Sequence, residues 1–137
     1  MAEMSPAAVD AFLRETRIAK LAYLNASGAP MVVPVWFEWD GTAARFFTSR
    51  KSPKARRIAR DPRVALSVEE PVGVPERWVT IEGVASLDAE GTSELLKRLA
   101  RRYYDAAKAE QTITEWLAEP SAWVTVVVTP ARIRSEG

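Results

Sequence analysis

A basic stretch in the first half of the chain begins with the signature of a helix start. Residues 48–60 read TSRKSPKARRIAR and place six Lys or Arg residues within eleven positions, interrupted by Ser52-Pro53. Ser is a preferred N-cap residue, and Pro is favoured in the first turn that follows. The free N–H groups at a helix start have no partners inside the helix and favour an anion. The stretch therefore predicts an anion site at the beginning of a short helix.

Neighbouring side chains add to this predicted site. Thr48 and Ser49 end the preceding strand, so their hydroxyls can reach the same turn, and Lys54 brings a mobile positive charge. Strand end, hydroxyls, helix start and Lys54 together predict a phosphate site without a Gly-rich loop. Arg57 lies three residues after Lys54 and can share its helix face, which would suit a ligand with several anionic groups. The alternative is that Ser52 only caps the helix and the basic residues face water.

The strand before this stretch contains an unusual combination of residues. Pro34 lies inside the apolar run VVPVWFEW and cannot donate a hydrogen bond to a neighbouring strand. Trp36 and Phe37 follow at once and place aromatic surface on both faces. A flat ring lying against a strand that has stopped pairing would explain this combination. The alternative, which this strand alone favours, is a proline bulge in a barrel with aromatic core residues.

The composition excludes several classes of chemistry. The chain of 137 residues has a net charge of +1, so the basic stretch is a local feature. The sequence has no Cys and no His, which excludes disulfides, cysteine nucleophiles and Ser-His-Asp arrangements. An enzyme of this composition must take its reactive atoms from a cofactor. No apolar run approaches the roughly 20 residues that span a bilayer, and the first residues lack the order of a signal peptide, so we expect a cytoplasmic protein.

The elements that must position these residues follow from hydrophobic periodicity and turn signals. Asp40-Gly41 between two apolar runs predicts a hairpin, and Gly83 inside a strand predicts a bulge or a close approach of another backbone. We expect a mainly β (α+β) fold, a six-stranded antiparallel barrel with flanking helices, as a single domain over residues 1–137. The predicted helices cover residues 5–16, 52–61, 92–109 and 112–119, and the predicted strands cover residues 18–25, 29–39, 42–49, 63–70, 78–87 and 121–133.

Taken together, these stretches resemble the pyridoxamine 5′-phosphate oxidase-like superfamily of split β-barrel flavoproteins, and most of all its flavin- and deazaflavin-dependent oxidoreductase branch. The resemblance rests on VVPVWFEWDG, FFTSRKSPKARRIARDPRVALSV, RWVTIEGVASL and the final VVVTPARIRS, which follow one another in the order of the family. It runs over nearly the whole chain. Its most specific part is the pattern K-x-x-x-I-x-x-D-P-R-V directly after the Thr-Ser strand end.

The resemblance implies a homodimer with a flavin-type cofactor in each of two clefts between the subunits. The ring of the cofactor would lie against the strand from Val33 to Phe37, and its phosphate would be held at Thr48, Ser49, Ser52 and Lys54. Trp78 would contact the cofactor from a later strand. The cofactor-binding residues that we expect, with Arg57 added from the spacing above, are Val33, Pro34, Val35, Trp36, Phe37, Thr48, Ser49, Ser52, Lys54, Arg57 and Trp78.

The function that we expect from these features is hydride transfer between coenzyme F420, or FMN, and a small conjugated organic acceptor. We expect no catalytic side chain and no metal, because the cofactor ring supplies the chemistry. Family members that oxidise pyridoxamine phosphate use a C-terminal Arg-x-His element, and the absence of His makes that activity unexpected here. Two alternatives stay open: a non-enzymatic flavin or deazaflavin carrier or sensor, and a nucleic-acid-binding barrel that uses the basic stretch. The near-neutral net charge counts against nucleic acid.

Overall fold

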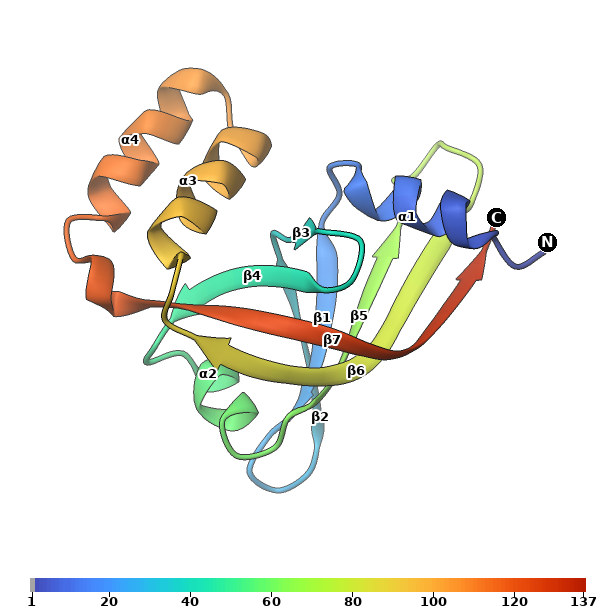
Figure 1. The fold of residues 1–137 in the computed structure, drawn as a ribbon, viewed down its shortest axis with the longest axis horizontal. Helices are drawn as coiled ribbons and strands as arrows, with labels where there is room; N and C mark the ends of the chain where they lie inside the picture. Colours follow the sequence, from blue (N-terminus) through green and yellow to red (C-terminus); the bar gives the residue numbers. More distant parts are fainter. Residues whose placement is uncertain (1) are drawn as a thin grey trace.

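The fold is organised around one antiparallel sheet of seven strands in a computed structural model that describes residues 2–137 (Figure 1). The strand order is β2-β1-β5-β6-β7-β4-β3, and every neighbouring pair is antiparallel. This confirms the predicted fold class, although the sheet has seven strands where the sequence predicted six. The strands are β1 (Ala19–Leu24), β2 (Pro30–Val35), β3 (Glu38–Trp39), β4 (Ala44–Ser49), β5 (Arg63–Glu69), β6 (Trp78–Asp88) and β7 (Trp123–Glu136).

The extra strand arises because the predicted strand 29–39 changes partner halfway along. Its first part, β2, pairs with β1, and its last part, β3, pairs with β4. The two parts form opposite edges of the sheet and are separated only by Trp36 and Phe37, so the sheet must curl until its edges meet. A barrel that is split at this point results. Pro34 lies on the edge strand β2, where its missing N–H costs no sheet hydrogen bond.

Alternating inward side chains fill the curled sheet, and helix α1 (Pro6–Arg14) covers one open end of it (Figure 1). Ser5 caps α1 by accepting a hydrogen bond from the Ala8 backbone N–H at 3.2 Å, as the sequence predicted. Three apolar side chains of α1 reach the core. The largest fully buried side chains of the protein are Phe12, Phe37, Phe46, Leu13, Leu21, Leu66, Ile81, Leu95, Leu96, Leu99, Val68 and Val79.

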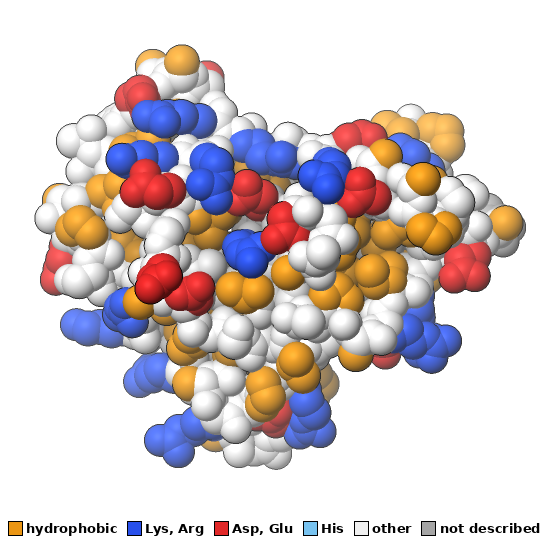
Figure 2. Space-filling model, viewed as in Figure 1, with side chains coloured by type: hydrophobic (Ala, Val, Ile, Leu, Met, Phe, Trp, Pro, Cys, Tyr) orange, Lys and Arg blue, Asp and Glu red, His pale blue; other side chains and the backbone are white. Residues whose placement is uncertain are grey.

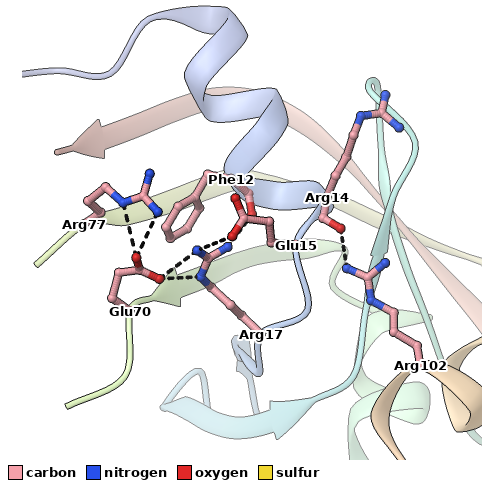
Figure 3. Close-up of polar contacts among 7 residues, drawn as sticks. All are labelled: Phe12, Arg14, Glu15, Arg17, Glu70, Arg77 and Arg102. Atoms are coloured by element: carbon pink, nitrogen blue, oxygen red, sulfur yellow. Dashed lines mark hydrogen bonds and ion pairs between the residues drawn. The ribbon is translucent and has the colours of Figure 1, made fainter. Parts of the chain in front are cut away.

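Arg17 fixes the turn after α1 to the loop between β5 and β6 (Figure 3). Its guanidinium bonds the Glu70 carboxylate at 2.7 Å and the Phe12 carbonyl oxygen at 2.6 Å, and it lies 3.7 Å from the centre of the Phe12 ring. Arg77 bonds the other Glu70 oxygen at 2.9 Å. Hydrogen bonds from Arg77 and Arg17 lower the pKa of Glu70. The buried pair of Arg17 and Glu70 is therefore satisfied from several sides, as buried charges require.

The long strands β6 and β7 carry a bulge at Gly83. Their register shifts between Glu82 and Gly83, and a Cβ atom built on Gly83 would lie 2.2 Å from the carbonyl oxygen of Thr129. No side chain fits at that distance, so only glycine permits this approach of the two backbones. Both parts of the prediction for Gly83, a bulge and a close approach, are confirmed.

The helical region after β6 differs from the prediction. The sequence predicted one helix over residues 92–109 and a short one over residues 112–119, whereas the structure has α3 (Thr92–Tyr103) and α4 (Ala106–Trp116). The break comes earlier because Asp105 takes extended backbone angles and accepts a hydrogen bond from the Lys108 N–H at 2.9 Å. This N-cap starts a new helix in the opposite direction. The two helices form a hairpin that stands beside the barrel (Figure 1).

The outer face of α3 carries basic side chains that are paired with acidic ones. Arg98 bonds Glu38 at 2.9 Å, and Arg101 bonds Glu110 at 3.0 Å. Figure 2 shows acidic and basic side chains interspersed over the helical side of the molecule. This pairing is that of a solvated helix face.

Candidate functional site

An open cleft of about 410 Å³ lies where the edge strand β2, strand β4, helix α2 (Pro53–Ile58) and the end of α4 meet. Its size falls in the range of small-molecule and cofactor sites. The cleft is mostly apolar, with polar groups gathered at the α2 side. The residues that line it are Ile18, Pro34, Val35, Trp36, Phe47, Thr48, Lys54, Trp116 and Trp123.

The polar end of the cleft is built from the strand end and the first turn of α2. Ser52 caps α2 by accepting the Ala55 N–H at 3.2 Å, and it accepts a second hydrogen bond from the Thr48 hydroxyl at 3.1 Å. Two accepted bonds leave the Ser52 O–H proton free to donate to a ligand. Helix α2 has only six residues, so the hydroxyls and Lys54, rather than a long helix dipole, define this end.

Lys54 contributes an uncompensated positive charge to the polar end. Its side chain is partly buried, and burial lowers the pKa of its ammonium group. Within residues 2–137, no carboxylate lies at ion-pair distance from it. A partly desolvated cation without a partner is unfavourable alone. A bound anion would relieve this cost, and a phosphate, which accepts several hydrogen bonds, fits the donors present.

The opposite side of the cleft is an aromatic wall, which we define as Trp36, Phe47, Trp116 and Trp123. The ring centres of Trp116 and Trp123 lie 5.4 Å apart with an interplanar angle of 35°, and Trp36 lies 6.0 Å from Trp116. Phe47 meets both Trp116 and Trp123 edge to face. These separations are those of interacting aromatic pairs. The wall is therefore an apolar cluster of tilted and edge-to-face rings that borders the cleft.

Tyr103 holds Trp36 in place at the split of the barrel. The two rings stack with their centres 5.2 Å apart and their planes 3° from parallel. The Tyr103 hydroxyl donates to the Arg17 carbonyl oxygen at 2.5 Å and accepts the Phe37 N–H at 3.3 Å. The hydroxyl thus satisfies a backbone N–H between β2 and β3, where regular strand pairing is interrupted.

The structure brings five of the eleven predicted cofactor-binding residues together in the cleft. These are Pro34, Val35, Trp36, Thr48 and Lys54. Ser52 joins them through its hydrogen bond from Thr48. The predicted aromatic surface on both faces is confirmed, because Trp36 faces the cleft while Phe37 is buried in the barrel core. The Phe37 side chain therefore cannot reach a ligand in this cleft.

The other predicted residues lie around the cleft or away from it. Val33 packs against the barrel core, and the Ser49 hydroxyl accepts the Lys51 N–H at 3.2 Å. Arg57 donates from Nε to the Leu24 carbonyl oxygen at 3.3 Å. Trp78 pairs with Glu136, at the opposite end of β7 from Trp123, and does not line this cleft. Within one chain, Trp78 therefore lies away from the polar end of the cleft.

Sequence reasoning missed four lining residues: Ile18, Phe47, Trp116 and Trp123. Phe47 could have been found from the sequence. It precedes Thr48 in a strand where Phe46 faces the core, and successive side chains of a strand face opposite sides. The position of Trp116 depended on the extent of α4, which the sequence predicted to be shorter. Trp123 is held by a hydrogen bond from its indole N–H to the Trp116 carbonyl oxygen at 2.7 Å. No sequence pattern predicts this contact.

Two features are absent from residues 2–137. No group of three or more acidic side chains is arranged to hold a metal ion there. Among the helices over residues 2–137, none is long and apolar enough to cross a membrane.

Comparisons with known proteins agree with this architecture. A curated relative, pyridoxine/pyridoxamine 5′-phosphate oxidase from Anaeromyxobacter dehalogenans (strain 2CP-C), is 35% identical over 107 residues, covering 76% of this chain and 48% of the relative. The chain thus spans about half the length of that relative. A solved structure of an F420 reductase is 27% identical with a TM-score of 0.73, covering 90% of this chain and 94% of its own. A conserved hypothetical protein from Mycobacterium tuberculosis is 29% identical with a TM-score of 0.75, covering 96% and 84% of the two chains.

The family itself is determined by a match over nearly the entire chain. The family model described as pyridoxamine 5′-phosphate oxidase matches residues 5–135, from the cap of α1 to the end of β7. The split barrel, the polar strand end and the cleft beside it all lie within the matched region. The chain belongs to the pyridoxamine 5′-phosphate oxidase family.

Proposed function

We propose that this protein is an oxidoreductase that binds a phosphorylated flavin-type cofactor, coenzyme F420 or alternatively FMN, and transfers hydride to a small conjugated organic acceptor. One observation carries the proposal. A cleft with the apolar strand surface of Pro34 and Val35 ends in a partly buried Lys54 and two hydroxyl groups, and Lys54 has no ion-pair partner within residues 2–137. The strand surface suits the flat ring of such a cofactor, and the polar end suits its phosphate. Family membership and the likeness to an F420 reductase support the same class.

The residues of the polar end would hold the cofactor phosphate. Lys54 would supply charge, Ser52 would donate its free O–H proton, and Thr48 would keep Ser52 oriented through their hydrogen bond. Pro34 and Val35 would offer an apolar strand surface to the ring. When bound and reduced, the cofactor supplies a hydride to the acceptor, and a proton from solvent completes the two-electron reduction. The chain itself orients both molecules and keeps water from the ring faces.

Coenzyme F420 is our first choice because the helix that carries Lys54 also carries a second cation. Arg57 is on the same short helix as Lys54, and the one hydrogen bond of its side chain within residues 2–137 runs from Nε to the Leu24 carbonyl oxygen. Arg57 forms no ion pair within residues 2–137. A cofactor with more than one anionic group would use this second cation, whereas FMN has a single phosphate.

We also propose a homodimer, as the family resemblance implies. Apolar side chains near the cleft are exposed on β2, including Val32 with 65% of its surface accessible and Met31 with 39%. An edge strand with exposed apolar residues is unfavourable in water and is a natural place for a second copy to cover. Sedimentation of the purified protein tests this proposal, with a mass of two chains expected and a mass of one chain contradicting it.

A single-turnover experiment tests the enzymatic proposal. Reduced F420 or reduced FMN is mixed anaerobically with 1,4-naphthoquinone, with and without the protein, and the loss of the reduced cofactor is followed by absorbance. Acceleration that saturates with protein concentration is expected. Tight cofactor binding without acceleration would favour the non-enzymatic carrier or sensor, and absence of binding would contradict the proposal altogether.

A further inference from the structure

The α3–α4 hairpin brings one side chain, Trp116, into a cleft that is otherwise built by the barrel and α2. The hairpin leaves the barrel after β6 and returns at β7, and it stands outside the sheet (Figure 1). Trp116 is the last residue of α4 and the only residue of the hairpin that lines the cleft within residues 2–137. Its ring contacts three others there, those of Trp36, Phe47 and Trp123.

Trp116 is not needed to fill the interior of the hairpin. That interior consists of the buried aliphatic side chains Leu96, Ala100, Ala109 and Ile113. Trp116 lies at the margin of this cluster and is only partly buried. Trp39, by contrast, is buried in the barrel core with its indole N–H bonded to Asp10 at 3.0 Å. A large, flat and partly exposed ring at a cleft margin is typical of a ligand contact.

The apolar lining of the cleft is of two kinds. Ile18, Pro34 and Val35 offer aliphatic surface, and the other part is the aromatic wall. The only charged side chain of the lining is Lys54, which the proposed function assigns to the cofactor phosphate. The aromatic wall is therefore an uncharged surface. The indoles of Trp116 and Trp123 both border the cleft, tilted by 35° with centres 5.4 Å apart.

We propose that Trp116 is a specificity-determining residue that, with Trp123, selects flat, uncharged acceptors of two fused rings by stacking. This inference rests on the proposed function and extends it by naming the acceptor class and the residue that recognises it. Stacking on an indole grows with the fused aromatic area of the ligand, so a molecule of equal size with a single ring and methyl groups gains less from it. Trp123 is held by its hydrogen bond to the Trp116 backbone, so a side-chain substitution at position 116 leaves that contact in place.

The test compares two quinones built from equal numbers of carbon and oxygen atoms. 1,4-Naphthoquinone is flat with two fused rings, whereas duroquinone has one ring surrounded by methyl groups. Dissociation constants for the oxidised, cofactor-loaded protein are measured by calorimetry. For Trp116→Ala we expect about tenfold weaker binding of naphthoquinone and less than about threefold weaker binding of duroquinone, with cofactor affinity unchanged. Trp116→Leu keeps an apolar side chain without a flat ring and should show the same loss if Trp116→Ala does not fold.

A matched control separates recognition from hairpin stability. Ile113→Ala removes buried volume from the same helix without touching the cleft, and it should leave the affinity for both quinones unchanged. Unchanged naphthoquinone affinity in Trp116→Ala would overturn the inference, as would equal losses for the two quinones. A loss of cofactor affinity in that variant would overturn it too, because the wall would then belong to the cofactor. Wild-type protein that binds neither F420 nor FMN would overturn the proposed function itself, a result that the cofactor titration reports separately.

Discussion

Replacing Lys54 by Ala removes the one unpaired cation of the cleft and tests how the polar end works. A hydrogen bond to a charged group contributes about 1.5–3 kcal/mol when it is well shielded from water. Lys54 is only partly buried, so solvent screening reduces this figure to about 1–2 kcal/mol. Because about 1.4 kcal/mol corresponds to a tenfold change, we expect the dissociation constant of the cofactor to rise about 5- to 30-fold.

The assay is quenching of tryptophan fluorescence, because three Trp residues line the cleft. Lys51→Ala is the matched control. It removes the same charge from the same basic stretch, but Lys51 is exposed and does not line the cleft. The control should change cofactor affinity by less than about twofold at physiological salt. Equal effects of the two substitutions would refute the reasoning, because they would show that only the general positive field matters.

The pH dependence of cofactor affinity is a second test of the role of Lys54. Burial lowers the pKa of Lys54 below its ordinary value of 10.5. The ammonium therefore loses its proton, and with it the attraction for phosphate, at a lower pH than an exposed lysine. We expect cofactor affinity to fall as the pH rises, with a midpoint below 10.5, while the phosphate stays fully ionised above about pH 7. In Lys54→Arg the decline should disappear, because arginine stays protonated throughout.

The same low pKa has a consequence for stability. Between the folded pKa and the ordinary value, the unfolded chain binds more protons than the folded one, so the free energy of unfolding increases as the pH rises through that window. Lys54→Ala should remove this increase, and the substitution should leave the fold stable, since it deletes a desolvated charge without a partner. A marked drop in melting temperature would contradict this view of Lys54.

Three further predictions concern the frame of the site. Gly83→Ala places a Cβ atom 2.2 Å from the Thr129 carbonyl oxygen, so we expect a loss of about 1–3 kcal/mol in urea denaturation; an unchanged midpoint would contradict the bulge geometry. Tyr103→Phe keeps the stack on Trp36 but removes the hydroxyl that accepts the Phe37 N–H, so the free energy of unfolding should fall by about 1–2 kcal/mol. A loss below roughly 0.5 kcal/mol, the lower limit for a net hydrogen bond, would contradict that role. Burial disfavours ionised Asp40, but hydrogen bonds from backbone and side-chain donors outweigh this effect and lower the pKa of Asp40. Asp40→Asn should therefore be less stable than wild type near pH 7, and the difference in stability should shrink as acid protonates the wild-type carboxylate. A difference that does not depend on pH would show that the charge is not involved.

The parts of the fold that the sequence predicted are those determined by local chemistry. Ser52 before Pro53 marked a helix start, and Gly83 marked the bulge, because each conformation depends on one or two residues. The polar end of the cleft was predictable for the same reason. Pro34 lies on the edge strand β2, still paired with β1, so the strand has not stopped pairing at this residue.

The parts that the sequence did not predict depend on distant partners. The apolar run around Trp36 and Phe37 has no local stop signal. The chain changes strand partner there because its first part, β2, pairs with β1 at one edge of the sheet and its last part, β3, pairs with β4 at the other. Asp105 was read as part of a long helix, since its capping hydrogen bond is visible only in three dimensions. Trp116 enters the cleft as a result of that early break. The aromatic wall is thus a tertiary feature.

The most direct test of the central claim is a side-by-side fluorescence titration of the purified protein with FMN and coenzyme F420. Saturable quenching by one of them is expected, together with a 5- to 30-fold loss of affinity in Lys54→Ala and little change in Lys51→Ala. This result would establish that the polar end of the cleft holds the phosphate of a cofactor whose ring occupies the cleft. If neither compound binds below high micromolar concentrations, the account of the cleft as a flavin-type cofactor site is wrong.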